Sequence, residues 1–377
     1  MKKISEKQKE LDKKIALEHR SQGIGRRTYR TKPHSDDEWL KINRWFQDKK
    51  SDGLDYTLER QRALTLHLPE CMDFSDNYEN TTTYIIAIRK LTEKKPKNKN
   101  QYHLKFVKFD KLKKISGSAA LVLTAELSKW DDTIRSNLTP LIENWDTEIL
   151  QQFRELGFFS LFKKSPKFPD TKSESHISLV KYIKGSCGDS DKTRQLKDAI
   201  QNIVGDRIDK WTFLHSGLTE AITNVSHHAY PNHEFLNKAD KSWYLSGAYN
   251  SKTQELKISF YDQGIGIPKS LPTSEIWERV LGLLSKINIG KGLLDAEMLK
   301  AAMEIDRTST GESDRGKGLQ DLLEFIRQRG EGYLSVLSRR GLYRFSLKNG
   351  EKEIKTHSFK MPLKGTLIIW SVSLAHN

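Results

Sequence analysis

The sequence predicts an α/β chain of two domains, and three observations support this fold class. At 377 residues the chain is long enough for two domains of ordinary size. Stretches in which apolar and polar residues alternate, typical of strands, lie between stretches in which apolar residues recur every three or four positions, typical of helices. Hydrophobic residues make up 36% of the sequence and include 8 Trp, so each half can fill a core.

The N-terminal half is expected to mix strands with helices. The expected elements are a strand at 64–68, a helix at 77–91, a strand at 103–109, a helix that begins after residue 115 and a helix at 148–156. Ser116 and Ser118 stand at the start of the fourth element. Serine is a common cap at a helix N-terminus because its hydroxyl accepts a hydrogen bond from a free backbone N–H.

The C-terminal half is expected to alternate helices with strands. A helix is expected at 213–230 and a half-buried strand at 256–260. Two further helices are expected at 276–287 and 293–305, another begins at Leu319, and a buried strand is expected at 367–370. Four short polar or glycine-containing clusters stand at junctions between these elements. Their placement is what we expect if one site draws its residues from four separate segments.

The first cluster contains Glu220 and Asn224, which are one helical turn apart and therefore project from the same face of the expected helix. Asn224 can supply an oxygen to Mg²⁺, which prefers oxygen ligands and keeps several waters. Glu220 can accept a proton from an attacking water or hydroxyl as a general base. The alternative is that both are ordinary polar residues of a helix.

The second cluster, which contains Asp262, Gly264, Gly266 and Ile267, follows the strand at 256–260. The two glycines permit positive backbone angles and close approach to a ligand. A carboxylate at a strand end can accept hydrogen bonds from the amino group of a base. The spacing differs from those of the dinucleotide fingerprint and the P-loop, and a plain turn is the alternative.

The third and fourth clusters are a glycine-rich segment before an apolar helix and a Gly-Thr pair before a strand. The segment contains Arg315, Gly316, Lys317, Gly318 and Leu319, and glycines that lead into a helix can bind phosphate through free backbone N–H groups. A flexible surface loop is the alternative. The Gly-Thr pair, at 365–366, opens the expected strand at 367–370 and is commonplace by itself.

The ordered set of four clusters resembles the motifs of the GHKL nucleotide-binding superfamily, over about residues 190–375. The first cluster is similar to the N box, the second and third to the G1 and G2 boxes, and the fourth to the closing Gly-Thr. The resemblance implies a two-layer α/β sandwich with a mixed sheet that binds ATP and Mg²⁺. It further implies Glu220 as the general base, Asn224 as the magnesium ligand, Asp262 as the carboxylate that reads adenine and Thr366 as its support. The other cofactor-binding residues that it implies are Gly264, Gly266, Ile267, Arg315, Gly316, Lys317, Gly318 and Leu319.

The first cluster, with His228 and Tyr230 after it, most resembles the anti-sigma-factor serine kinase branch of this superfamily. The long segment at about 269–315 is expected to form a helical lid that moves with the nucleotide, and a helical insertion without a gating role is the alternative. No upstream histidine stands in a phosphoacceptor context, so autophosphorylation on histidine is not expected.

The N-terminal half resembles a STAS-like domain, as found in anti-sigma-factor antagonists, on the pattern of strand, Ser-Gly-Ser turn and helix. The resemblance implies Ser116 and Ser118 as candidate phosphoacceptors, and helix capping by both serines is the alternative. Together the two resemblances predict an N-terminal extension at 1–58, a STAS-like α/β domain at 59–185 and a GHKL domain at 186–377.

The formal net charge of +15 indicates an acidic or nucleic-acid partner, or a solubilising tail. Residues 2–32 hold eleven Lys or Arg against four acidic residues, so the extension at 1–58 is expected to be basic and helical. The two cysteines, far apart, indicate neither a disulfide framework nor a zinc site. No segment has the 18 apolar residues of a membrane span, and a cytoplasmic protein without membrane contact is expected.

Three functions remain open from the sequence. The leading one is a regulatory protein that binds Mg-ATP, changes its contacts with a protein partner and hydrolyses ATP slowly. The second is a protein serine kinase that acts on itself or on an antagonist partner. The third is a nucleic-acid-associated ATPase that uses the basic N-terminus. A protein partner is expected in the first two, and a homodimer is a further expectation because dimers are frequent in this superfamily.

Overall fold

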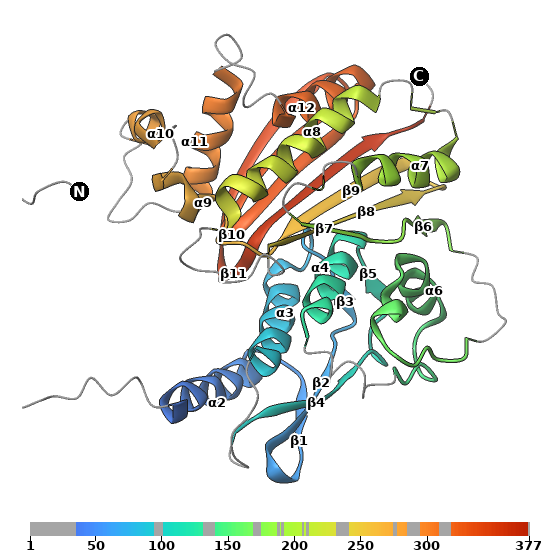
Figure 1. Ribbon diagram of the computed structural model, residues 1–377, viewed down its shortest axis with the longest axis vertical. Helices are drawn as coiled ribbons and strands as arrows, with labels where there is room; N and C mark the ends of the chain where they lie inside the picture. The colour runs from blue at the N-terminus through green and yellow to red at the C-terminus, as the bar shows by residue number, and fades with distance from the viewer. Residues whose placement is uncertain are drawn as a thin grey trace, which may run out of the picture.

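The fold was analysed in a computed structural model. It describes residues 35–93, 101–130, 140–168, 175–186, 189, 192–205, 207–208, 211–230, 241–273, 277–284, 295–308 and 318–375. The described chain is a mixed α/β protein with several sheets, the largest of which has six strands (Figure 1).

The first part of the fold, residues 35–168, is called the N-terminal module here. Its helices are α2 (Ser35–Ser51), α3 (Tyr78–Thr92), α4 (Gly117–Ser128) and α6 (Thr147–Leu156), with short 3-10 turns η1 (Arg60–Arg62) and η2 (Phe158–Leu161). Its strands are β1 (Tyr56–Leu58), β2 (Ala63–His67), β3 (Cys71–Met72), β4 (His103–Lys108) and β5 (Lys114–Ile115). β2 pairs antiparallel with β1 and parallel with β4, and β3 pairs parallel with β5.

The five elements expected in the N-terminal half are confirmed as β2, α3, β4, α4 and α6, each within one or two residues of its expected ends. Local chemistry explains two of these ends. The hydroxyl of Ser116 accepts a hydrogen bond from the backbone N–H of Ala119 and so caps α4. Gly157 ends α6 at a φ of 82°, in the left-handed region that a side chain disfavours.

The large sheet contains β6 (Ile177–Leu179), β7 (Ile183–Ser186), β8 (Ser242–Asn250), β9 (Glu255–Asp262), β10 (Gly332–Lys348) and β11 (Glu351–Ser373). Its strands are ordered β10-β11-β9-β8-β6, and β7 also pairs with β8. β6 and most of β7 thus belong to this sheet although they lie within residues 59–185.

The prediction of a mixed sheet for this half is wrong, because every strand pairing that the structure describes within the large sheet is antiparallel. The connections give the reason. β8 and β9 are joined by the short turn 251–254, and β10 and β11 by the pair Asn349 and Gly350. Both residues of that pair have positive φ values, 51° and 78°, which is typical of a type I′ hairpin turn. Tight hairpins necessarily pair neighbouring strands antiparallel.

Helices α7 (Lys192–Val204), α8 (Trp211–Asn224) and α12 (Gly318–Arg329) cover one face of the large sheet, and the N-terminal module covers the other (Figure 1). The helix expected at 213–230 is confirmed as α8, but it changes to a π-helical turn, η3, at Val225–Ala229. A short helix α9 (Ile267–Ser270) and a 3-10 turn η5 (Leu271–Thr273) follow β9.

One sheet therefore serves two cores. On β9, Phe260 packs with the helices and its neighbour Tyr261 packs with the N-terminal module. On β11, Ile368 faces the helices while Leu367 and Ile369 face the module. This alternation follows from the two-residue period of a strand, and it places α8 and the N-terminal module on opposite sides of the same strands.

The two helices expected in the lid segment are confirmed as α10 (Trp277–Leu284) and α11 (Asp295–Thr308). α11 packs against the β10–β11 hairpin, where Leu299 is fully buried in the helix-side core. The Asp295 carboxylate accepts a hydrogen bond of 2.9 Å from the backbone N–H of Arg340. This half of the expected lid is therefore anchored to the edge of the sheet.

Of the extension expected at 1–58, residues 1–34 lie outside the described residues. Its remainder includes α2 and β1, and Trp39, Ile42 and Phe46 of α2 are buried in the core of the N-terminal module. Within the described parts of the chain, no helix combines the length and apolar character needed to cross a membrane.

Candidate functional site

Asp262 occupies the last position of β9, between two neighbouring strands of the large sheet. It lies opposite Thr366 on β11 and opposite Trp243 on β8. Its carboxylate oxygen Oδ1 accepts a hydrogen bond of 2.8 Å from the backbone N–H of Gly264. Thr366 donates to the same carboxylate from its hydroxyl and its backbone N–H. The residue is 3% exposed, so a buried carboxyl group is held at the strand end by donors from two segments.

Burial raises the pKa of Asp262 to about 7, although the hydrogen bonds from Gly264 and Thr366 and the charge of Lys129 favour the ionised form. The cost of removing a carboxylate from water therefore exceeds the gain from its donors. Carboxyl groups whose pKa is raised by burial are frequent at functional sites, where a bound ligand can supply further hydrogen bonds to the carboxylate.

The pair Gly365 and Thr366 lies inside β11, whereas a position ahead of a strand was expected from the sequence. The register between β10 and β11 shifts beside it, and Gly365 has a φ of 75°. A β-carbon at Gly365 would stand 2.0 Å from the backbone oxygen of Asp262. The glycine is thus required by both backbone angle and space, and it lets β11 approach the end of β9 closely.

Ser338 of β10, which is not among the site residues expected from the sequence, joins the segments around Asp262. Its hydroxyl donates to the backbone oxygen of Gly365 at 3.0 Å and accepts from the backbone N–H of Ile267 at 2.9 Å. It also lies 3.0 Å from the hydroxyl of Thr366. The register of β10 against β11 places Ser338 opposite Thr366, and no local pattern around Ser338 indicates that pairing.

The turn after Asp262 is fixed to the end of α8. The backbone N–H of Ile265 donates to the carbonyl oxygen of Ala229, the last residue of the π-helical turn, at 2.9 Å. A β-carbon at Gly264 would lie 2.3 Å from that same oxygen, so only glycine permits the contact. Gly266 has a φ of 84° and lies against Ser338. Both glycines of the second cluster are therefore needed for backbone packing, and π-helical turns of this kind often occur at functional sites.

Glu220 and Asn224 lie in the last part of α8, which leads directly into this junction. Leu218, Ala221 and Ile222 of the same helix are buried against the sheet, whereas Glu220 and Asn224 are half-buried. Within the described residues, neither of these two polar side chains has a hydrogen bond or an ion pair. Their oxygens are thus free to contact a ligand.

The third cluster can be placed only in part. Arg315, Gly316 and Lys317 lie outside the described residues. Gly318 is the first residue of α12 and Leu319 the second, and α12 packs beside α8 (Figure 1). The described part of the third cluster therefore belongs to a helix that packs next to the one carrying Glu220 and Asn224.

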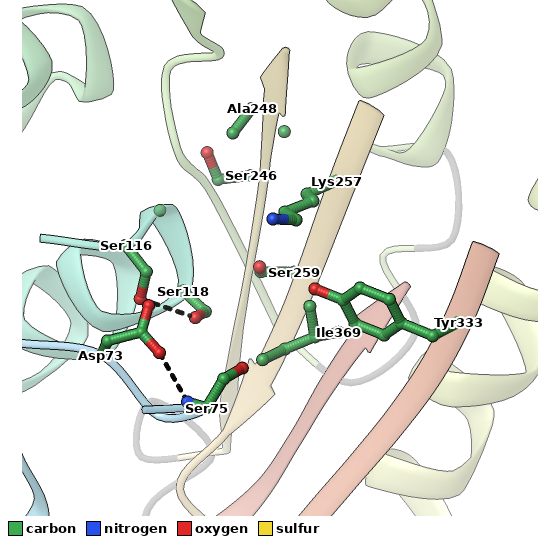
Figure 2. A pocket seen from close by; sticks show the side chains of 12 residues that line it. Asp73, Ser75, Ser116, Ser118, Ser246, Ala248, Lys257, Ser259, Tyr333 and Ile369 are labelled. Atoms are coloured by element: carbon green, nitrogen blue, oxygen red, sulfur yellow. Dashed lines mark hydrogen bonds between the residues drawn. The ribbon is translucent and has the colours of Figure 1, made fainter. Parts of the chain in front are cut away.

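The candidate phosphoacceptors lie elsewhere. Figure 2 shows Ser116 and Ser118 at the start of α4, with their hydroxyl oxygens 3.2 Å apart. They line a cavity of about 50 Å³ between the N-terminal module and the module-side face of β8, β9 and β10, opposite Lys257 and Tyr333. Ser118 is 7% exposed. The capping interpretation is confirmed for Ser116, and phosphorylation of either serine stays a prediction.

The residues around Asp262 suit an adenine nucleotide with Mg²⁺ by their chemistry. The carboxyl group can accept from an amino group of a base, and the oxygens of Glu220 and Asn224 are of the kind that Mg²⁺ prefers. In the described chain, no group of three or more His, Cys, Asp and Glu is arranged to hold a metal ion. No protein-family model matches this sequence, and no curated protein matches it. The residues themselves are thus the basis for any functional assignment.

Proposed function

We propose that the C-terminal half binds Mg-ATP and acts as a nucleotide-dependent regulatory switch with slow ATP hydrolysis. The observation that carries the proposal is the buried carboxyl group of Asp262, held by Gly264 and Thr366 beside the end of a helix with two unpaired oxygen-bearing side chains. Such a site offers hydrogen-bond acceptors to a purine amino group at one end and oxygens to a metal-phosphate group at the other.

Each residue has a distinct role in this proposal. Asp262 accepts a hydrogen bond from the adenine amino group, and Thr366 holds the carboxylate in place. Asn224 contributes an oxygen to the magnesium ion, and Glu220 accepts the proton of the attacking water. The metal ion, when bound, neutralises charge on the phosphate oxygens. Gly318 and Leu319, at the start of α12, approach the phosphates through the backbone of the helix N-terminus.

A titration of magnesium-dependent ATP binding, together with phosphate release from gamma-labelled ATP, tests the proposal. We expect Asn224→Ala to abolish magnesium-dependent binding, and Glu220→Ala to retain binding but lose phosphate release. His215→Ala is the matched control, because His215 is an exposed residue of the same helix. Unchanged affinity in Asn224→Ala refutes the assignment of the metal site.

For the serine kinase alternative, the positions of the candidate phosphoacceptors relative to the large sheet matter. Ser116 and Ser118 lie on the face that packs with the N-terminal module, whereas Glu220 lies on a helix that covers the other face. For phosphate transfer within one chain, the proposed site and these serines would have to meet across the sheet, which does not favour that reaction. A kinase of this architecture would act on another molecule, and labelled protein in the same assay would reveal it.

The role of a nucleic-acid-associated ATPase rests on the basic segment 2–32, which lies outside the described residues. That alternative stays a prediction. ATP turnover that rises with added DNA or RNA, and no longer rises after removal of residues 1–32, would support it.

A further inference from the structure

The contact between the N-terminal module and the sheet contains a buried ion pair. Arg89 of α3 and Glu126 of α4 form a two-point contact, in which the Arg89 Nε–H donates to Oε2 of Glu126 at 3.0 Å and Nη2 donates to Oε1. The side chains are 13% and 6% exposed. Burial disfavours the charge on Glu126, but the charge and hydrogen bonds of Arg89 outweigh it and hold the pKa of this carboxyl group below its ordinary value.

Glu126 also reaches out of its own module to the sheet. Its Oε1 atom accepts a hydrogen bond of 2.8 Å from the side-chain amide of Gln263 and one of 3.3 Å from the hydroxyl of Tyr261. These two residues flank Asp262, the residue proposed to read adenine. Since side chains alternate along a strand, Tyr261 and Gln263 face the module while Asp262 lies between them.

Gln263 is held from both sides of the sheet. Its backbone N–H donates to the hydroxyl of Tyr230, just after the π-helical turn, at 3.0 Å. Its side chain is buried, and the amide oxygen Oε1 has no hydrogen-bond partner among the described residues. Among the described residues, the side-chain amide of Gln263 therefore bonds to Glu126 alone. An apolar side chain of the same size would pack equally well there, so the amide is explained by this hydrogen bond.

The N-terminal module also forms hydrogen bonds with the backbone of the neighbouring strand β11. The hydroxyl of Tyr78 donates toward the backbone oxygens of Arg339 and Met361 at 3.0 and 3.1 Å and accepts from the backbone N–H of Leu363 at 3.2 Å. The carboxylate of Glu79 accepts from the backbone N–H groups of Lys360 and Met361. These contacts hold β11 just before Gly365 and Thr366. Both strands that shape the surroundings of Asp262 are therefore fixed by the N-terminal module.

We infer that Glu126 is a positioning residue of the nucleotide site, which acts through Gln263 to set the turn that holds Asp262. The inference rests on the proposed function, and it makes adenine affinity depend on the hydrogen bond between Glu126 and Gln263. Arg89 and Glu126 belong to the same module, and the contacts of Glu126 with the sheet are to an amide and a phenol.

The test compares Gln263→Met with the unsubstituted full-length chain. Methionine matches glutamine closely in size but cannot donate to Glu126, and it leaves the pair with Arg89 unchanged. We expect Mg-ATP to bind about tenfold more weakly, the effect of one lost hydrogen bond to a charged group. The dissociation constant of inorganic tripolyphosphate, which lacks adenine, should be about equal in both proteins when it is derived from competition with a fluorescent ATP analogue whose own affinity is measured for each protein.

The matched control is Glu93→Gln. Glu93 pairs with Lys364 at 3.2 Å across the same boundary between module and sheet, but the pair is exposed. Gln263→Asn is a second variant, one methylene shorter and still polar, in case Gln263→Met does not fold. Amide hydrogen exchange over residues 261–267 provides a readout without nucleotide, and it should be faster in both Gln263 variants and unchanged in the control.

Each outcome decides the inference. Unchanged ATP affinity, or equal loss of ATP and tripolyphosphate binding, overturns the positioning role while leaving the proposed function in place. Unchanged hydrogen exchange over residues 261–267 also overturns it. If the unsubstituted protein does not bind ATP, the proposed function fails and the inference fails with it.

Discussion

Replacement of Asp262 by asparagine should stabilise the protein at alkaline pH while weakening its binding of ATP. The carboxyl group is 3% exposed, and its pKa is raised from 3.8 to about 7 by burial. An aspartic acid with a raised pKa binds its proton more tightly in the folded than in the unfolded chain. The stability that this proton provides is complete below pH 3.8 and is lost as the pH rises through 7. Asparagine does not titrate and therefore avoids this loss.

The magnitude follows from the two pKa values. The full difference between about 7 and 3.8 corresponds to about 4 kcal/mol above pH 7. At pH 5 the unfolded chain is already largely ionised, and the loss is about 1.5 kcal/mol there. The free energy of unfolding of Asp262→Asn relative to the unsubstituted protein should therefore rise by about 3 kcal/mol between pH 5 and pH 8. This comparison removes any constant difference between asparagine and protonated aspartic acid.

The assay is urea unfolding of both proteins at pH 5 and pH 8, followed by tryptophan fluorescence, with calorimetric ATP binding at pH 8. The amide oxygen of asparagine can still accept the hydrogen bond from the backbone N–H of Gly264. In that orientation the amide NH₂ of asparagine points toward the adenine amino group. Two opposed donors should weaken ATP binding by about 10- to 100-fold. Asp198→Asn is the control, because Asp198 is exposed on α7.

Two results would refute this reasoning. A relative stability that stays constant between pH 5 and pH 8 would mean that Asp262 is not a carboxyl group with a raised pKa. ATP affinity that survives the substitution would mean that the carboxylate does not read the base. The first result bears on the electrostatics of the fold and the second on the proposed function.

The remaining predictions concern the segments around the site. Gly365→Ala should cost more than about 3 kcal/mol in urea unfolding, because a β-carbon would stand 2.0 Å from a backbone oxygen of β9 at a φ of 75°; Gly350→Ala, at a φ of 78° but in open space, should cost only about 1–2 kcal/mol. Arg89→Met should cost about 3–5 kcal/mol by leaving Glu126 buried without its partner, with a larger loss at pH 8 than at pH 5, and an equal loss at both pH values would contradict the pairing. Tyr78→Phe should cost about 1–3 kcal/mol by releasing three backbone groups of β10 and β11, and a stability equal to that of the unsubstituted protein would show that these bonds contribute nothing.

Most elements of the fold were predictable because their signals are local. The helix that became α3, the serine cap of α4 and the glycine that ends α6 all depend on neighbouring residues. The two lid helices were also found from their apolar spacing, although their attachment to the β10–β11 hairpin was not. Periodicity records which face of an element is apolar, but it does not record what covers that face.

The site was predictable only in its separate parts. The pattern of Asp262, Gly264 and Gly266 predicts a turn after a strand. The structure shows that a side chain at either glycine would collide with neighbouring atoms. Ser338 was missed because its role depends on the register of β10 against β11, which shifts at that position. Glu126 was missed because it meets Gln263 across 137 residues of sequence. Contacts of this kind are fixed by tertiary packing, which a single sequence does not display.

The sharing of one sheet between two cores limits how the chain can be divided. A fragment that kept only the C-terminal half would expose to water six apolar side chains that the N-terminal module now covers: Tyr244, Tyr261, Leu337, Leu363, Leu367 and Ile369. A large exposed apolar patch of this kind favours aggregation. The C-terminal half should therefore be insoluble by itself unless polar residues replace this set, and soluble expression should require both halves in one polypeptide or their production together.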